Sequence, residues 1–302
     1  LKEGKMDIIQ QGNSVVIRNA VEFEPRHIFE NGQCFRWTRE DDGSYTVVAM
    51  KRVINVRKDG DDVIIDNCSM ADFNDIWYSY FDMGRDYAAL RKELSQIDSH
   101  LREAAEFAQG LRILRQDMFE MVISFIISAN NQIPRIKKSV DRLSEICGEP
   151  IGEYRGQMRY AFPSVSAVAS ISEENLAAIK VGFRAPYILK SANMILSREV
   201  DLESTGNLSY EDACNELMKL AGVGPKVADC ILLFGDAREI AFPVDTWVIK
   251  FMNEYYLEQS DKNMKRIKKR GIEVFGDKAG FAQQYLFYHA RESGLGKKGP
   301  AV

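Results

Sequence analysis

The sequence predicts an α+β fold, in which an N-terminal antiparallel β-sheet domain precedes a larger helical body. Between residues 33 and 66, short segments of alternating apolar and polar residues are separated by turns rich in Asp and Gly, as in antiparallel strands. From about Ala71 onward, the apolar residues recur with helical spacing. Late in the chain, Gly222-Val223-Gly224 stands between two apolar helical segments and indicates a tight hairpin turn.

The N-terminal sheet is predicted from two consecutive hairpins. Their strands are expected at Gln33–Arg39, Ser44–Met50, Arg52–Arg57 and Asp62–Asp66. In the first of these strands, Phe35 and Trp37 fall on the same side. This alternation gives the sheet one apolar and one polar face, which suits antiparallel pairing.

The helical body is predicted to surround one buried helix. Asp117 and Glu120 have the spacing of a capping box, and the segment Met118–Ala129 after them is apolar almost all round. Further helices are expected near Gln132–Cys147, Arg184–Ser197, Tyr210–Leu220, Lys226–Phe234, Thr246–Tyr256 and Lys278–Arg291. We place the sheet domain, with short helices, at residues 6–110 and the helical body at residues 111–302.

The composition is that of an ordinary globular protein, with 45% hydrophobic and 28% charged residues. No apolar run approaches the roughly 20 residues that cross a bilayer. No signal-peptide pattern opens the chain. We therefore expect an intracellular protein that has no membrane partner.

The cysteines and histidines argue against a resident metal. The 5 cysteines are an odd, scattered set, which is not a disulfide framework. No cysteine follows Cys230, so the four-cysteine iron–sulfur site that could follow the glycine turn is excluded. The 3 histidines lie far apart in sequence, which disfavours zinc. Metal-free chemistry without a cofactor is expected.

Two residues near the hairpin turn predict covalent chemistry on a phosphate-linked substrate. Lys226 opens the helix after the turn and supplies an amine nucleophile. Asp245 follows Pro243-Val244 and is expected to cap the next helix, where its pKa would stay low and its charge fixed. Gly222 and Gly224 are expected to take positive φ and to let a phosphate approach the backbone.

At this point the chain resembles a known family. Leu217–Asp229, followed by Pro243-Val244-Asp245, resembles the helix-hairpin-helix, Gly/Pro-Asp superfamily of DNA glycosylases. Three segments resemble its 8-oxoguanine DNA glycosylase branch: Gly32–Trp37, Ser124–Asn131 and Val223–Cys230. The resemblance runs in the right order from Gly32 to Phe287.

The resemblance implies a bifunctional DNA glycosylase/AP lyase. Such an enzyme flips 8-oxoguanine out of duplex DNA, excises it through a lysine Schiff base, and can nick the abasic strand. Its expected partner is double-stranded DNA containing 8-oxoguanine, and its expected form is a monomer that stays with the DNA inside the cell. The family's helix-hairpin-helix would lie at about residues 210–235, its aspartate-bearing loop at 241–245, and its C-terminal helix would close the base pocket.

The base pocket is carried over residue by residue. Gly32 matches the residue whose backbone carbonyl accepts the N7–H that 8-oxoguanine has and guanine lacks. Phe287 and Cys230 match the two sides of the sandwich that holds the flipped base, and Gln283 matches the group that reads its Watson–Crick edge. Gly32 could instead serve a turn, and Phe287 could instead be a core residue.

Other matches concern the DNA around the lesion. Asn130 matches the residue that fills the gap left by the base, and Arg135 and Arg184 match those that read the opposite cytosine. Phe183 stands where the animal enzymes usually have a tyrosine wedge. Trp247 stands where a phosphate-contacting histidine is expected, and its indole N–H can still donate.

The resemblance also implies a structural monovalent or calcium ion at the hairpin, and no catalytic metal. Its ligands would be the backbone carbonyls of Met218, Leu220 and Val223, because hard cations prefer oxygen.

Three questions remain open at this level. The net charge of −4 is unlike that of DNA-binding proteins, and the basic run Lys262–Arg270 is either a solvated helix face or a phosphate contact. A monofunctional glycosylase for alkylated bases or adenine mispairs is one alternative function. A non-catalytic module that uses the hairpin only as a phosphate clamp is another.

Overall fold

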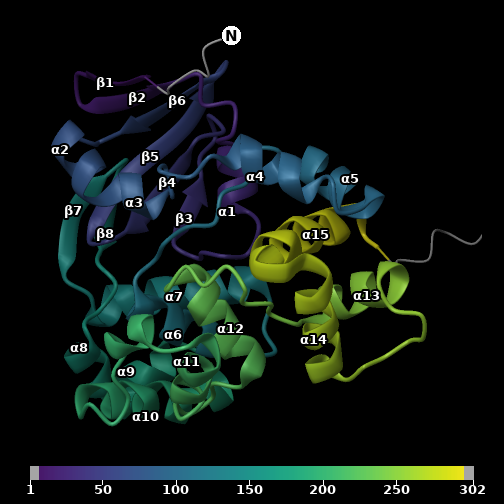
Figure 1. Cartoon of the computed structure of the whole chain (residues 1–302). Coiled ribbons are helices and arrows are strands. Elements are labelled where there is room, and N and C mark those ends of the chain that lie inside the picture. The colour runs from purple at the N-terminus through teal and green to yellow at the C-terminus, as the bar shows by residue number, and fades with distance from the viewer. Residues whose placement is uncertain (1–6, 296–302) are drawn as a thin grey trace, which may run out of the picture.

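The computed structural model describes residues 7–295, and the predicted α+β class is confirmed. Met6 and residues 296–302, which belong to the predicted domain ranges, lie outside the described residues. In Figure 1 a twisted sheet lies beside a larger group of helices. The sheet is antiparallel and six-stranded, in the order β1-β2-β6-β5-β4-β3. Its strands are β1 (Asp7–Gln11), β2 (Ser14–Arg18), β3 (Trp37–Arg39), β4 (Tyr45–Ala49), β5 (Arg52–Asp59) and β6 (Asp62–Asp66).

Three of the predicted strands are confirmed as β4, β5 and β6, joined by tight hairpins. The predicted strand at Gln33–Arg39 is wrong over its first half, because pairing begins only at Trp37. Gln33 is buried in a loop, where its side-chain amide donates to the carbonyls of Ile28 and Arg112. Strands β1 and β2 were not predicted, and they extend the sheet beyond β6.

Short helices connect the sheet to the helical body. They are α1 (Pro25–Phe29), α2 (Met70–Asp72), the π-helical turn η1 (Phe73–Trp77), α3 (Tyr78–Tyr80), α4 (Tyr87–Leu94) and α5 (Ser99–Phe107). Apolar side chains of α4 and α5 belong to the core of the helical body, although both helices precede residue 110. In Figure 1 these two helices lie next to the C-terminal helix α15 (Ala279–Ser293).

The helical body contains every helix that the sequence predicts, together with others. Its helices are α6 (Met118–Ser128), α7 (Ile133–Cys147), α8 (Val165–Ala169), α9 (Glu173–Ala178), α10 (Ala185–Leu196), α11 (Tyr210–Leu217), α12 (Pro225–Phe234), α13 (Thr246–Tyr255), α14 (Met264–Phe275) and α15, with 3-10 turns η2 (Gly182–Arg184), η3 (Ser204–Asn207) and η4 (Gly276–Lys278).

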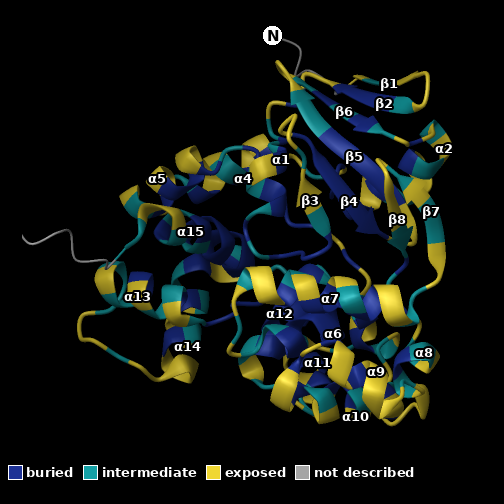
Figure 2. Ribbon diagram, turned by 180° about the vertical axis from the view of Figure 1, so that it is seen from behind, coloured by how far each residue is buried: buried dark blue, intermediate teal, exposed yellow. Residues whose placement is uncertain are grey.

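Helix α6 is buried along almost its whole length, as predicted from its sequence (Figure 2). Its N-cap is Asp117, whose carboxylate accepts the backbone N–H of Glu120 at 2.8 Å. The helix packs on α12, so that Phe125 of α6 stacks on Phe234 of α12 with ring centroids 5.6 Å apart. This packing fixes the helix that carries Lys226 against the centre of the molecule.

A small hairpin, β7 (Pro150–Tyr154) and β8 (Gln157–Tyr160), interrupts the helical body and was not predicted. Arg155 in its turn pairs with Asp42 of the sheet domain at 3.1 Å. The buried guanidinium of Arg36 donates to the carbonyl of Tyr160. The hairpin therefore ties the helical body to the sheet.

The basic run Lys262–Arg270 forms much of α14, and several of its charges are paired within the protein. Lys268 donates to the buried carboxylate of Asp229 at 2.8 Å. Arg266 pairs with Asp261 at 2.6 Å. This arrangement favours the interpretation of the run as a helix face over a phosphate contact.

The buried acid of α6 makes stability depend on pH. Burial is the main cause that raises the pKa of Glu120 to about 7, and Arg36 opposes it. The folded-state pKa exceeds the ordinary value of 4.5. The contribution of Glu120 to the free energy of unfolding is therefore fully present below about pH 4.5 and is lost as the pH rises through about 7. Glu120→Gln is expected to stabilise the protein at pH 8 by up to about 3 kcal/mol and to have little effect at pH 4.5. Chemical denaturation of both proteins at the two pH values measures this, and an equal effect at both would contradict it.

Candidate active site

The hairpin turn between α11 and α12 needs a glycine at position 222 for steric reasons. Gly222 has φ +80°, and a Cβ there would lie 3.0 Å from the ring of Tyr187. Gly224 differs, because it is the N-cap of α12 with φ −101°. The prediction of positive φ at Gly224 was therefore wrong, but a Cβ there would meet nothing within 4 Å. The surface at Gly224 is open to an approaching phosphate.

Lys226 occupies the first turn of α12, immediately after Pro225, as predicted. Its side chain is partly buried, and its Nζ lies 5.3 Å from the centroid of the Phe125 ring. It lines a pocket between the sheet domain, α12 and α15. The pocket is formed by Asn31, Gly32, Phe125, Lys226, Cys230, Phe234, Pro243, Asp245, Gln283, Gln284 and Phe287.

Asp245 lines the same pocket and caps α13, as predicted. One oxygen of its carboxylate accepts the backbone N–H groups of Trp247 and Val248, each at 2.9 Å. The predicted low pKa was wrong in direction. Burial raises the pKa of Asp245 above 3.8, while the two backbone N–H groups and Lys226 oppose the rise. The carboxylate is thus fixed in orientation but poorly hydrated.

The four residues predicted for base recognition all line this pocket. Gly32 has φ +87°, and the position of its absent Cβ lies 3.9 Å from the ring of Phe287. Burial is the main cause that raises the pKa of the Cys230 thiol to about 11, so this wall is uncharged near neutral pH. Gln283 is buried, and its Oε1 has no hydrogen-bond partner among the described residues. An unpaired amide oxygen of this kind can accept a ligand N–H.

Sequence reasoning missed several members of the pocket. Asn31, Phe125, Phe234, Pro243 and Gln284 were not assigned to it. Phe125 and Pro243 lie within the motifs that carry the family resemblance, so that signal was available. The cavity has a volume of about 50 Å³, which is small beside the roughly 300–1,000 Å³ of typical ligand pockets.

A second hollow brings together three of the seven residues predicted to face the DNA, which are Asn130, Arg135 and Arg184. Its volume is about 400 Å³. It is lined by Asn130, Asn131, Arg135, Lys138, Ser139, Arg142, Lys180, Val181, Gly182 and Arg184. Five of these described residues are basic and none is acidic. A concave surface of one charge attracts phosphate groups.

The guanidinium of Arg184 forms hydrogen bonds with backbone carbonyls around this hollow. Its guanidinium donates to the carbonyls of Ala129, Asn130 and Val181, and so fixes the turn in which Asn130 takes φ +51°. Phe183 is 58% exposed, and the guanidinium of Arg184 lies over its ring at 4.3 Å. Phe183 is thus an exposed aromatic ring on a fixed support. Arg135 is exposed and has no ion pair among the described residues.

The remaining predicted residues lie at the helix ends beside the pocket. Trp247 is partly buried in the first turn of α13, with the ammonium of Lys250 4.1 Å above its ring. Met218, Leu220 and Val223 lie in the turn after α11, where the carbonyl of Leu220 accepts the backbone N–H of Val223 at 3.2 Å. Oxygen donors of this kind suit a hard cation. Within residues 7–295 no group of three or more His, Cys, Asp or Glu side chains is arranged to hold a metal.

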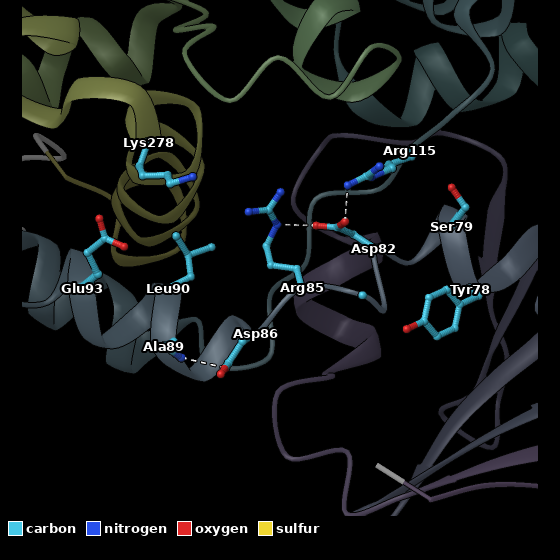
Figure 3. A pocket seen from close by; sticks show the side chains of 11 residues that line it. Tyr78, Ser79, Asp82, Arg85, Asp86, Ala89, Leu90, Glu93, Arg115 and Lys278 are labelled. Atoms are coloured by element: carbon cyan, nitrogen blue, oxygen red, sulfur yellow. Dashed lines mark hydrogen bonds and ion pairs between the residues drawn. The ribbon is translucent and has the colours of Figure 1, made fainter. Parts of the chain in front are cut away.

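A larger cavity, with a volume of about 610 Å³, lies elsewhere. Figure 3 shows its charged groups, with the carboxylate of Asp82 bonded to both Arg85 and Arg115. Its lining contains neither Lys226 nor Asp245. Among the helices that the structure describes, none has the length and apolar character of a membrane span.

Two family models match the chain in sequence. Residues 15–122 match the N-terminal domain of 8-oxoguanine DNA glycosylase. Residues 123–275 match the HhH-GPD superfamily of base excision DNA repair proteins.

Curated relatives carry related names. A probable N-glycosylase/DNA lyase of Methanothermobacter thermautotrophicus is 35% identical over 66% of this chain and 69% of its own length. The N-glycosylase/DNA lyase OGG1 of Arabidopsis thaliana is 31% identical over 86% of this chain and 75% of its own length.

Solved structures of similar chains include complexes with DNA. The 8-oxoguanine glycosylase/lyase of Clostridium acetobutylicum, bound to double-stranded DNA with cytosine opposite 8-oxoG, has a TM-score of 0.92 and 45% identity. The comparison covers 96% of this chain and 99% of that one. MBOgg1 in complex with a low-affinity DNA ligand also has a TM-score of 0.92, at 44% identity, covering 96% of this chain and 100% of that one.

The cap made by Asp245 can be separated from its charge by two substitutions. Asp245→Ala removes the acceptor of two backbone N–H groups and is expected to destabilise the protein by about 1 kcal/mol. Asp245→Asn keeps an acceptor oxygen and removes the charge, so its free energy of unfolding is expected to stay within about 0.5 kcal/mol of wild type. Urea denaturation at pH 7 measures both, and equal losses in the two variants would show that the cap is not the stabilising contact.

Proposed function

The chain belongs to the HhH-GPD superfamily of base excision DNA repair proteins, within its 8-oxoguanine DNA glycosylase branch, and from this premise we infer that it is a bifunctional DNA glycosylase/AP lyase. It excises 8-oxoguanine from duplex DNA and cleaves the abasic strand. The observation that carries this function is the pocket in which Lys226 and Asp245 meet Gly32, Gln283 and Phe287.

Base recognition in this proposal uses both walls of the pocket. The flipped base stacks between Phe287 and the thiol of Cys230, which burial keeps neutral. The free Oε1 of Gln283 accepts an N–H of the Watson–Crick edge. The carbonyl of Gly32 accepts the N7–H that distinguishes 8-oxoguanine from guanine. Guanine would instead present a lone pair to that carbonyl.

The chemical step joins Lys226 to the sugar. The neutral amine attacks C1′ as the C1′–N9 bond breaks, and the bonding electrons leave with the base, which takes up a proton. Loss of the amine proton and opening of the sugar give a Schiff base. Removal of a C2′ proton then drives β-elimination, in which the 3′ phosphate leaves. Hydrolysis of the Schiff base releases the free lysine.

Asp245 is proposed to stabilise the positive charge that develops on the sugar. Its carboxylate is already oriented by two backbone N–H groups, so no reorganisation is needed as the charge forms. Poor hydration of the carboxylate strengthens its interaction with a cation in the pocket. The same poor hydration raises its pKa, as described above.

Recognition of the opposite strand is assigned to the basic hollow. We propose that Asn130 fills the space left by the flipped base and that Phe183 acts as a wedge beside it. Arg135 extends from the exposed face of α7 and can donate to the opposite cytosine. Arg184 is proposed to contact that cytosine while it supports Asn130. Gly222, Gly224 and Trp247 would receive the phosphates next to the lesion.

Two further proposals concern ions and assembly. A monovalent or calcium ion is proposed at the carbonyls of Met218, Leu220 and Val223, where it would help the hairpin to bind a phosphate. All the groups required for catalysis come from one chain, so the monomer is proposed as the active form. We also propose that the enzyme is located inside the cell, together with its DNA substrate.

Lys226 provides the direct test of the covalent step. Wild-type protein with a duplex containing 8-oxoguanine opposite cytosine is expected to give a protein–DNA adduct on reduction with borohydride. Lys226→Gln removes the only amine proposed to attack C1′, so the adduct is expected to disappear, with strand cleavage reduced at least about 1000-fold. DNA binding by the variant, measured by fluorescence anisotropy, serves as the control. An undiminished adduct would refute the role of this lysine.

The pKa of Asp245 predicts the acid side of the pH profile. Only the carboxylate stabilises a cation, and its folded-state pKa lies above 3.8. The single-turnover rate of base excision is therefore expected to fall as the pH decreases through that raised pKa. Rates measured in a series of buffers at constant ionic strength give the midpoint. A midpoint at or below 3.8, with the protein still folded by circular dichroism, would contradict the assignment.

A further inference from the structure

Arg291 lies one helical turn beyond Phe287 on α15, on the same face as Gln283. Its side chain is only 17% exposed. The Nη1 atom is shielded from solvent and has no hydrogen-bond partner among the described residues. It lies 3.6 Å from the position that a Cβ would take on Gly32. The guanidinium also lies 5.6 Å from the centroid of the Phe287 ring.

This arginine connects the two walls of the base pocket. Its Nη2 donates to the carbonyl of Glu30 at 2.5 Å. Glu30 begins the loop that carries Gly32, and α15 carries the two residues that hold and read the base. The contact therefore joins segments that are far apart in sequence but enclose the same ligand.

The other end of the loop is anchored independently. Gln33 is fully buried, and its side-chain amide donates to the carbonyls of Ile28 and Arg112. Its backbone carbonyl accepts a hydrogen bond from the side-chain amide of Gln116. Near the middle of the loop, Gln284 donates to the carbonyl of Asn31 at 3.2 Å. Loss of Arg291 would therefore loosen the Glu30 side of the loop without releasing the rest.

Fold stability alone does not explain why an arginine occupies position 291. A buried N–H without a partner costs about 1–3 kcal/mol. The partly exposed carboxylate of Glu292 accepts both Nε and Nη2, which balances the charge but leaves Nη1 unpaired. A shorter apolar residue would avoid that cost, so the guanidinium is better explained by the position it gives to the loop.

We propose that Arg291 is a positioning residue of the base pocket, which holds the Glu30–Gly32 segment against α15 so that the Gly32 carbonyl stands at a fixed place beside Phe287. The inference rests on the proposed function, because that carbonyl is assigned there to the N7–H of 8-oxoguanine. A single hydrogen bond distinguishes the lesion from guanine. Its geometry therefore has to be held closely, since a displacement of about 1 Å can cost about 100-fold in rate.

The test compares two reactions of the same enzyme. Excision of 8-oxoguanine needs the base pocket, whereas cleavage of a preformed abasic site needs Lys226 and the phosphate contacts but no base. Arg291→Met keeps the apolar stem and removes the clamp. It is expected to slow single-turnover excision opposite cytosine by about 10- to 100-fold. Abasic-site cleavage is expected to stay within about twofold of wild type.

Two variants serve as controls. Arg291→Lys keeps the charge and one donor group and is expected to recover part of the excision rate. Arg91→Met removes an arginine of similar exposure that does not line the pocket. Arg91 forms an ion pair with Glu22 at a distance of 2.8 Å. This substitution is expected to change the ratio of the two reactions by less than about twofold, whatever its effect on stability.

The outcomes separate this inference from the proposed function. An excision rate in Arg291→Met equal to that of wild type would overturn the clamp. So would an equal slowing of both reactions, because a general structural effect would then be responsible. A wild-type protein that cleaves abasic sites but does not excise 8-oxoguanine would instead refute the proposed substrate.

Discussion

The carboxylate of Asp245 is held by two backbone N–H groups at the start of α13, and the chemistry that we propose for the pocket depends on this fixed charge. The amine of Lys226 approaches from the start of a second helix, α12, which is packed on the buried helix α6. Two helix N-termini thus bring one amine and one carboxylate to the same pocket. Because neither element can move without disturbing the core, the two groups stay in position without a ligand.

Much of the fold could be predicted because its signals are local. Helix α6 has a capping aspartate and apolar residues all round, and the strands β4 to β6 alternate between Gly-containing turns. Strand β1 gave no such signal, because it is a short edge strand with largely exposed residues. The hairpin β7–β8 was missed for a similar reason, since it has only two strands and its Met158 is 52% exposed. Its position comes from contacts with the sheet domain, including Arg155 with Asp42, that sequence spacing does not reveal.

In the candidate site, too, the features with local sequence signals could be predicted and those set by distant contacts could not. Lys226 and Asp245 sit at helix starts, whose caps and turns are encoded within a few residues, and both were placed correctly. The environment of each group was harder to predict. The expected low pKa of Asp245 came from its cap, whereas burial by distant segments has the larger effect and the opposite sign. The bonds from Arg184 to Asn130 and from Arg291 to Glu30 join residues far apart in the chain. Such contacts exist only once the fold brings its segments together.

The negative net charge is compatible with DNA binding once the charges are placed in the fold. The densest basic run of the sequence is turned partly inward, with Lys268 neutralising the buried Asp229. The hollow beside Asn130 instead draws its basic side chains from two separate segments, which are residues 135–142 and 180–184, and no acidic residue shares its lining. The potential at that surface is set by these nearby charges, because acids farther away than about 8 Å are screened at physiological ionic strength. A count over the whole chain therefore gives the wrong sign for the local charge of this hollow.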